Sequence, residues 1–458
     1  MRRSEITVRA IDHDSITHPA MKIRVFTLLV LLSGGLASLS AAPVTFYDKD
    51  PAHQWNRLHS VLMTQAPEGK TVPDDLLDPP HTLRLLSGEP NREALALLGE
   101  FVAQPLPETV IPLRRAVLQR DLLAVFHIAV GENYTERTAP QRELITALAR
   151  AIRHVALTAE EIRKLPDNYT AAASALDAVT TDDPEHPRAF LPKDLLADDG
   201  PWIAVNGQGL DSYAGRAHFT FLKGRSSFEV RMRHPGGREA GLAYLKSLAD
   251  MPQPLVWEKP AEPAVQFNNI SGVPRWLNPV TPKFPKGTAW ALIRRAILAD
   301  TKGQPVTSPL VESVQVRVYR SVGTVDSLDS ELTKLTEAEQ EAVIAKQLVT
   351  SFEWEARRSL LLGKGGFHQT TLDEIQYSHF APIEAKPDRQ GRPLTNFCLQ
   401  CHFTPGIFSI QSRTRQFFND TSILPLAFAP TDRLALDRAA ESIASPLLGW
   451  TLLHWLWQ

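Results

Sequence analysis

The sequence predicts an α+β protein with a helical N-terminal part, a central antiparallel β-rich part and a mostly helical C-terminal part. Apolar residues recur at helical three-and-four spacing up to about residue 175, alternate with polar residues between 217 and 320, and return to helical spacing after residue 330. The 458 residues, 43% of them hydrophobic, suffice for two or three domains with large cores. The predicted regions are helical over 45–200, β-rich over 201–325 and mostly helical over 330–458.

Residues 21–40 predict a secretory signal peptide. Lys22 and Arg24 precede the apolar run VFTLLVLL at 25–32, and small residues follow it. A basic start, a short apolar run and a small-residue exit are typical of such peptides. The run is short for a membrane span, so we expect a periplasmic or otherwise exported protein with no membrane span after signal removal. The alternative is an uncleaved anchor. Residues 1–20 add nothing to the pattern and are interpreted as a mis-assigned start.

Capping signals and apolar periodicity predict the helices of the N-terminal part. Asp50 and Pro51 are expected to cap and open the first helix, and Asn91 to cap the second. Thr158 and Glu161 form a capping box for a short helix. The longer predicted helices span 52–63, 92–101, 112–130 and 141–156. A Pro- and Asp-rich break at 181–201 marks the boundary between the helical part and the β-rich part.

Period-two alternation predicts strands in the central part. Val314, Val316 and Val318 alternate with polar residues, as in a half-buried strand. The predicted strands are 217–222, 227–233, 289–298 and 311–320, with a helix at 237–250 and an irregular loop at 251–288. In the C-terminal part we expect one long or two abutting helices over 331–362, ended by the glycine-rich segment 363–366, then an extended segment at 381–396 and a last helix at 430–457.

The charge balance excludes one class of partner. Lys plus Arg is 49 and Asp plus Glu is 51, which gives a formal net charge of −2. Proteins that bind nucleic acids usually carry a basic patch or a basic domain, so no nucleic-acid partner is expected.

The two cysteines of the chain lie in one short motif, Cys398-Leu399-Gln400-Cys401-His402. Two thiols at this spacing can add to the two vinyl groups of one porphyrin, and the adjacent imidazole is then held beneath the iron as the proximal ligand. The motif therefore predicts one covalently attached haem c in the C-terminal region. The predicted signal peptide agrees with this, because haem c is attached outside the cytoplasm.

The motif resembles that of c-type cytochromes. The resemblance covers the CLQCH segment and at most the last 60 or so residues, and it is specific for haem attachment rather than for one family. Small cytochromes c also carry a methionine ligand after the motif. The five methionines of this chain, Met1, Met21, Met63, Met232 and Met251, all precede it. The usual His–Met order is therefore absent, and so is the usual basis for a high potential.

Two other interpretations of the motif are open. A zinc site made by Cys398, Cys401 and His402 would need a fourth ligand and usually a second paired motif. A disulfide or a thioredoxin-like redox pair would follow a strand in a small α/β fold. The preceding segment, KPDRQGRPLTNF, contains no strand-like run.

Several residues are candidates for the far side of the iron. His454 lies 52 residues after His402 in GWTLLHWLW, on a predicted apolar helix, and is the first candidate. The others are His368, His379, Met232 and Met251, or an open or water-bound iron. Arg413 and Arg415 follow the motif closely, and their guanidinium groups suit haem propionates.

The first functional hypothesis is an exported c-type cytochrome-like protein that binds one haem and transfers electrons to or from a redox partner protein. One alternative is a haem enzyme, a peroxidase-like oxidoreductase with an open distal site. Another is a β-rich binding protein with an accessory haem. A di-haem peroxidase needs two motifs, and the sequence contains one.

Overall fold

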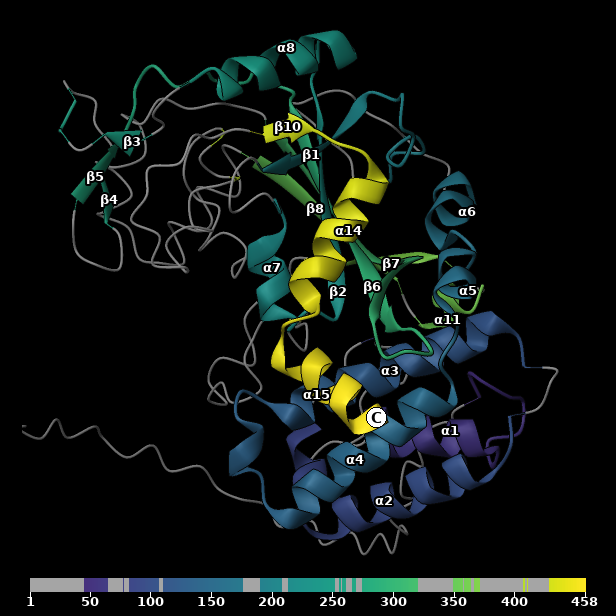
Figure 1. Ribbon diagram of the computed structural model, residues 1–458. Coiled ribbons are helices and arrows are strands. Elements are labelled where there is room, and N and C mark those ends of the chain that lie inside the picture. Colours follow the sequence, from purple (N-terminus) through teal and green to yellow (C-terminus); the bar gives the residue numbers. More distant parts are fainter. Residues whose placement is uncertain are drawn as a thin grey trace, which may run out of the picture. The chain divides into compact units, whose positions relative to one another are not determined.

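The computed structural model (Figure 1) describes residues 45–64, 77, 82–106, 110–175, 190–207, 213–251, 255–256, 258–260, 266–268, 274–319, 349–356, 358–363, 366–370, 407, 410 and 428–458. These residues form an α+β fold, as predicted, in which helices pack around a seven-stranded antiparallel sheet. The predicted signal peptide at 21–40 and the segment 1–20 lie outside the described residues. So do residues 331–348 of the predicted C-terminal helix, the segment 381–396, and residues 181–189 of the predicted break at 181–201.

The N-terminal helices are α1 Gln54–His59, the π-helical turn η1 Ser60–Thr64, the 3-10 turns η3 Thr82–Leu86 and η4 Tyr134–Glu136, α2 Gly88–Ala103, α3 Pro112–Val130, α4 Ala139–His154, α5 Ala159–Arg163 and α6 Asn168–Ala175. The predicted helix at 112–130 is confirmed as α3. Pro112 stands in its first turn, where a missing N–H costs nothing, and Gly131 ends it with a φ of 66°. The capping box of Thr158 and Glu161 is confirmed as well.

Two predicted N-caps are wrong. The first helix begins at Gln54, and the side chain of His53 rather than Asp50 accepts the capping bond, from the N–H of Trp55. Helix α2 begins at Gly88, so Asn91 lies inside it and is buried. The Asn91 amide instead donates to the Leu85 carbonyl, 2.9 Å away, and ties η3 to α2.

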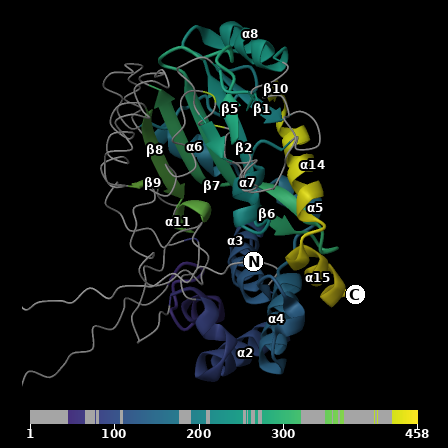
Figure 2. The same cartoon turned by 90° about the vertical axis from the view of Figure 1, so that its left-hand side faces the viewer.

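The main sheet has the strand order β10-β1-β2-β6-β7-β8-β9, and every pair is antiparallel. Its strands are β1 Trp202–Gly207, β2 Ser226–Arg233, β6 Ala289–Ala299, β7 Pro305–Tyr319, β8 Val349–Ala356, β9 Phe367–Thr370 and β10 Phe428–Pro430. The predicted strands at 227–233, 289–298 and 311–320 are confirmed as β2, β6 and β7. Strands β9 and β10 are the two edges, and Figure 2 shows them at opposite ends of the series.

Helices cover the two faces of the sheet differently. Helix α8 Gly237–Ala249, the predicted helix at 237–250, packs on β1, β2 and β10. The short helix α7 Arg216–Phe221 packs on β2, and in Figure 1 it lies on the opposite side of the sheet from α5 and α6. We call the side of the sheet that α8 covers the α8 face. The opposite side is the α14 face, where α14 Arg433–Ala444 packs on β2 and β7 beside the buried Arg295 and Glu229.

Two predicted elements have the wrong type. The run 217–222 belongs to helix α7, where Phe219 and Leu222 are buried three residues apart, and a run of six residues does not separate period two from period three. Residues 349–356, predicted as helix, form strand β8. Phe352 to Ala356 alternate apolar and polar side chains, and pairing with β7 and β9 outweighs the helical tendency of the preceding segment.

The segment 251–288 is not wholly irregular. It contains a small sheet of order β3-β5-β4, with strands β3 Leu255–Val256, β4 Gln266–Asn268 and β5 Pro274–Leu277. Near the C-terminus the one predicted helix is two, α14 and α15 Leu448–Trp457, because Pro446 follows the end of α14. The glycine-rich segment was predicted to end a helix, and Gly363, with a φ of 80°, does follow the short helix α11 Arg358–Leu361.

The described apolar side chains form two clusters. The larger one joins α1 to α6, the α14 face and α15. The smaller one, which we call the aromatic cluster, lies beneath α8. Its buried members are Ile203, Val205, Val230, Met232, Tyr244, Leu245, Leu248, Phe284, Trp290, Tyr319, Ile407 and Phe428.

Candidate functional site

The predicted haem ligands Cys398, Cys401 and His402 lie outside the described residues, as do His379, Arg413 and Arg415. Their roles therefore stay predictions from the sequence. The first described residue after the motif is Ile407, five residues beyond His402. The described surroundings of Ile407 are the part of the structure that bears most directly on the motif.

Ile407 attaches the chain to the aromatic cluster. Its side chain is buried there, and Ile410 packs against the same cluster. The Ile410 N–H donates to the Ile407 carbonyl at 3.1 Å, which makes a local turn. Five residues span at most about 18 Å, so covalent geometry keeps His402 within that distance of this cluster.

The aromatic cluster is built from edge-to-face and tilted ring contacts. Phe284 contacts Tyr319 with ring centroids 4.7 Å apart, and its ring lies 6.3 Å from that of Trp290. The Trp290 ring lies 5.5 Å from Phe428, the first residue of edge strand β10. Large apolar and aromatic surfaces of this kind suit a flat porphyrin.

Two hydrogen-bond donors lie on the same face of the sheet as this cluster. Met232, Trp290 and Arg317 are directly paired across β2, β6 and β7, so their side chains share the α8 face. The buried indole Nε1 of Trp290 has no hydrogen-bond partner. Among the described residues, none makes a hydrogen bond or ion pair with the half-buried guanidinium of Arg317. Tyr319, two residues along β7, belongs to the cluster.

Ile407, the first described residue after the motif, thus lies in an apolar and aromatic cluster whose described members are buried against one another. A histidine stands nearby. Burial, with a contribution from the Arg317 charge, lowers the pKa of His218 on α7 to about 4. His218 is therefore neutral near pH 7, and its ring centroid lies 5.4 Å from that of Phe228.

His454, the first candidate for the far ligand, lies elsewhere. It is on α15, which packs on α3 and α4, and its Nδ1 lies 3.2 Å from the Lys302 carbonyl in the β6–β7 turn. The Gln304 amide nitrogen lies 3.2 Å from the same Nδ1, and the Gln458 amide nitrogen lies 3.1 Å from Nε2. Both ring nitrogens are thus engaged. Trp290 and the β6–β7 turn lie at opposite ends of β6, about 30 Å apart at 3.3 Å per residue.

The remaining described candidates differ in position. Met232 is fully buried in the aromatic cluster, and its methyl group packs against Gly241 of α8. Met251 is buried just after α8. His368 is half-buried on edge strand β9, opposite Glu355 of β8. Of these three, Met232 alone shares a cluster with Ile407.

A second group of buried charged side chains lies at the other end of the sheet. Asp121 of α3 accepts two hydrogen bonds from Arg358, at 2.8 and 3.1 Å, and one from the Tyr47 hydroxyl at 2.7 Å. His59 Nδ1 lies 3.5 Å from the same carboxylate. Burial alone would raise the pKa of Asp121, but Arg358 and His59 outweigh it and hold this pKa well below its usual range.

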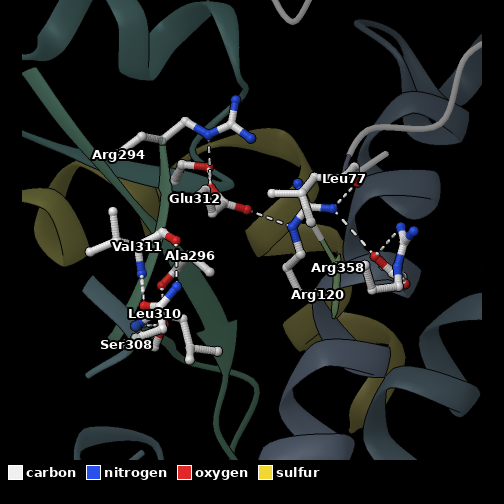
Figure 3. Close-up of polar contacts among 12 residues, drawn as sticks. Leu77, Arg120, Arg294, Ala296, Ser308, Leu310, Val311, Glu312 and Arg358 are labelled. Carbon is white, nitrogen blue, oxygen red and sulfur yellow. Dashed lines mark hydrogen bonds and ion pairs between the residues drawn. The ribbon is translucent and has the colours of Figure 1, made fainter. Parts of the chain in front are cut away.

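The network continues into the sheet through Glu312. Its carboxylate accepts from Arg294 Nε at 3.0 Å, and it pairs with Arg120 of α3 and with the Ser226 hydroxyl. Figure 3 shows Glu312 between Arg294 and Arg120. All of these groups are buried and paired, so the network joins α3 to the sheet and to α11. We therefore interpret the network as structural, because it holds these elements together, and we propose no reaction for it.

The α14 face holds a further buried cluster. Glu229 pairs with Arg231 and Arg295, which outweigh burial and lower the pKa of Glu229. Burial raises the pKa of Asp437 on α14 to about 6, although Arg295 and Arg433 oppose the shift. These charges fix α14 on the sheet.

Two absences concern the described residues alone. They contain no group of three or more His, Cys, Asp or Glu side chains arranged to hold a metal ion. None of their helices is both long enough and apolar enough to cross a bilayer. Comparison with known proteins gave no match among protein-family models, curated proteins or solved structures.

The sequence did not single out Arg317, Trp290 or the buried ion network. Arg317 reads as the polar side of a half-buried strand, next to Val316 and Val318. One signal was present: Arg294 and Arg295 interrupt an otherwise apolar strand run, and adjacent charges on both faces of a strand indicate buried pairing.

Proposed function

We propose that this protein is an exported c-type cytochrome-like protein that binds one covalent haem and transfers single electrons to or from a redox partner protein. The observation that carries the proposal is the motif Cys398-Leu399-Gln400-Cys401-His402, which contains both cysteines of the chain. The predicted signal peptide at 21–40 supports it independently.

The haem would be held by thioether bonds from Cys398 and Cys401, with the His402 imidazole as proximal ligand. When bound, it supplies a reversible one-electron Fe(III)/Fe(II) couple. The remaining chain would have to shield the group. Apolar side chains such as those around Ile407 would limit water access, and limited water access raises the potential of a haem.

A second candidate is a haem enzyme with an open distal site. One observation supports it: the ring nitrogens of His454 are both occupied by hydrogen bonds at the β6–β7 turn and the C-terminus. An iron without a strong sixth ligand could take peroxide. An electron carrier with six ligands could not.

Covalent attachment is the first test. The protein is expressed with a cytochrome c maturation system, denatured in SDS and stained for haem. We expect a stained band at the mature mass, with the mass increased by one haem. Cys398→Ala should weaken the stain, and Cys398→Ala with Cys401→Ala should abolish it. Ser409→Ala, a change close to the motif that removes no thiol, is the control.

An unstained wild-type band without the added mass would refute the proposal. Cell fractionation tests export in the same preparation, where we expect the protein outside the cytoplasm and lacking residues 21–40. A cytoplasmic chain that retains Met1 would refute export, and attachment of haem c would then lack its compartment.

A further inference from the structure

We propose that the outer side of helix α15 binds the surface of a bilayer that contains anionic lipids. This side, which we call the Trp455 face, consists of Leu448, Thr451 and Trp455. The contact is peripheral: Trp455 enters the headgroup region, and basic side chains beside it meet the lipid phosphates. The inference goes beyond the proposed function and does not depend on haem attachment.

Helix α15 has one buried side and one exposed side. Leu448, Thr451 and Trp455 follow one another at steps of three and four residues, so they lie on one side of the helix. Leu448 is 40% exposed and Trp455 is 63% exposed. The other side packs on α3 and α4 (α15 is the yellow helix beside the label C in Figure 2). This packing determines which side of α15 faces outward.

The three tryptophans of α15 have different surroundings. Trp450 donates its indole N–H to the Gly224 carbonyl at 3.0 Å, and Trp457 donates to the Ala149 carbonyl at 2.8 Å. Both rings are buried in the larger apolar cluster. Trp455 is exposed, and its indole makes no hydrogen bond to another described residue. An indole combines a large apolar ring with one N–H donor, which suits the boundary between hydrocarbon and water.

The exposed charged side chains on the two segments beside the end of α15 are basic. Nδ1 of His454 lies 3.2 Å from the Lys302 carbonyl, and Arg153 of α4 donates to the Trp457 carbonyl at 2.6 Å. Arg150 lies three residues before Arg153, on the same side of α4. In the β6–β7 turn and the last two turns of α4, the exposed charged residues are Lys302, Arg150 and Arg153. Their positive charge complements anionic lipid headgroups.

The small area of the Trp455 face favours a bilayer over a folded partner. A stable interface between two folded proteins buries about 800 Å² on each partner. The two large apolar side chains of this face together expose roughly 200 Å². Peripheral membrane binding needs only a few apolar side chains with basic ones beside them. The predicted export would also bring the protein close to a membrane surface.

The experiment measures co-sedimentation of the purified protein with lipid vesicles. The protein is purified after export and processing, because the apolar run at 25–32 would itself bind lipid. The two vesicle types are phosphatidylcholine alone and phosphatidylcholine mixed with phosphatidylglycerol, which is anionic. We expect binding to the mixed vesicles, and weaker binding both to phosphatidylcholine alone and at high salt, because salt screens the attraction between charges.

The variants separate the apolar contribution from the charge contribution. Trp455→Ala should lower the partition coefficient on mixed vesicles about tenfold, because it removes the largest apolar side chain of the face. Lys302→Gln and Arg150→Gln should each lower it about fivefold and leave binding to phosphatidylcholine unchanged. The controls are Leu434→Ala, at a 53% exposed leucine on α14, and Arg92→Gln on α2, and both should bind like the wild type.

Equal binding by wild type, Trp455→Ala and Lys302→Gln would refute the proposal, and so would a wild type that does not sediment with the mixed vesicles. If Trp455→Ala does not fold, Leu448→Ala and Lys302→Gln carry the test. Sedimentation velocity without lipid tests the other occupant, a second copy of this chain. A dimer that Trp455→Ala dissociates would overturn the lipid assignment, and a monomer in both proteins supports it.

Discussion

Acid should destabilise the fold through His127, a histidine that is buried in the neutral form. It lies on α3 where α15 crosses, and its ring is 5.2 Å from that of Trp450 and edge-to-face with Phe126. Gly449 of α15 approaches so closely that a Cβ there would overlap the imidazole. Its Nε2 makes no hydrogen bond. Burial, aided by the charges of Arg225 and Lys223, lowers the pKa of His127 to about 3.

The magnitude follows from linkage. The folded pKa lies below the unfolded value of 6.5, so the unfolded chain binds a proton that the folded chain excludes. The stability contributed by the neutral ring is complete above pH 6.5 and is lost as pH falls from 6.5 towards 3. At pH 4.5 the loss covers two pH units, and at about 1.36 kcal/mol per unit it amounts to about 2.7 kcal/mol.

The assay is urea unfolding of wild type and His127→Phe at pH 7.5 and pH 4.5. His127→Phe keeps a ring of similar size that does not titrate. Other groups, including Asp437 with its raised pKa, are common to both proteins and cancel in the double difference. We expect the wild type to lose about 2–3 kcal/mol more than the variant between the two pH values.

Phe126→Leu is the control, because it loosens the same contact without changing a titrating group and should lower stability equally at both pH values. A double difference below about 0.5 kcal/mol for His127→Phe, which is within the usual additivity error, would refute the idea that the folded chain keeps this ring dry and neutral.

Two further predictions concern the buried ion network and His454. Asp121→Asn should destabilise the fold by about 3–5 kcal/mol in urea unfolding, because it leaves the Arg358 charge without its carboxylate, and Asp121→Asn combined with Arg358→Met should recover part of that loss; no recovery would contradict a direct pairing. His454→Ala should leave the ferric visible spectrum of the holoprotein unchanged while lowering its melting temperature, whereas a change from low-spin to high-spin bands would show that His454 ligates the iron.

The fold was predictable where one local signal dominates. Helix α3 follows from a long three-and-four pattern that begins at Pro112 and ends at Gly131. Strand β7 follows from the alternation around Val314 and Val316. Helix α7 and strand β8 were assigned the wrong type, because a short run of either period is decided by its tertiary partners. Long-range pairing, such as β10 with β1, leaves no trace in a local pattern.

The candidate site also has one part that the sequence predicts and another that only the strand register reveals. Haem attachment depends on a contiguous motif, so the sequence alone predicts Cys398, Cys401 and His402. The pairing of Trp290 with Arg317 depends on which residues face each other across two strands, and that requires the register. Trp290 and Arg317 are 27 residues apart, and nothing in the local sequence links them.

The sheet also constrains which side chains could ligate the iron of a haem attached at His402. His402 lies within about 18 Å of Ile407, and Ile407 is buried in the aromatic cluster with Trp290. His454 is bound to the β6–β7 turn, about 30 Å further along β6. For both histidines to ligate one iron, the five residues before Ile407 would have to run almost fully extended along the sheet, and His454 would have to give up its bond from Gln458. Each condition costs free energy that an open or differently ligated iron does not require. The distance between two ends of one strand thus argues for a far ligand from the α8 face or for none.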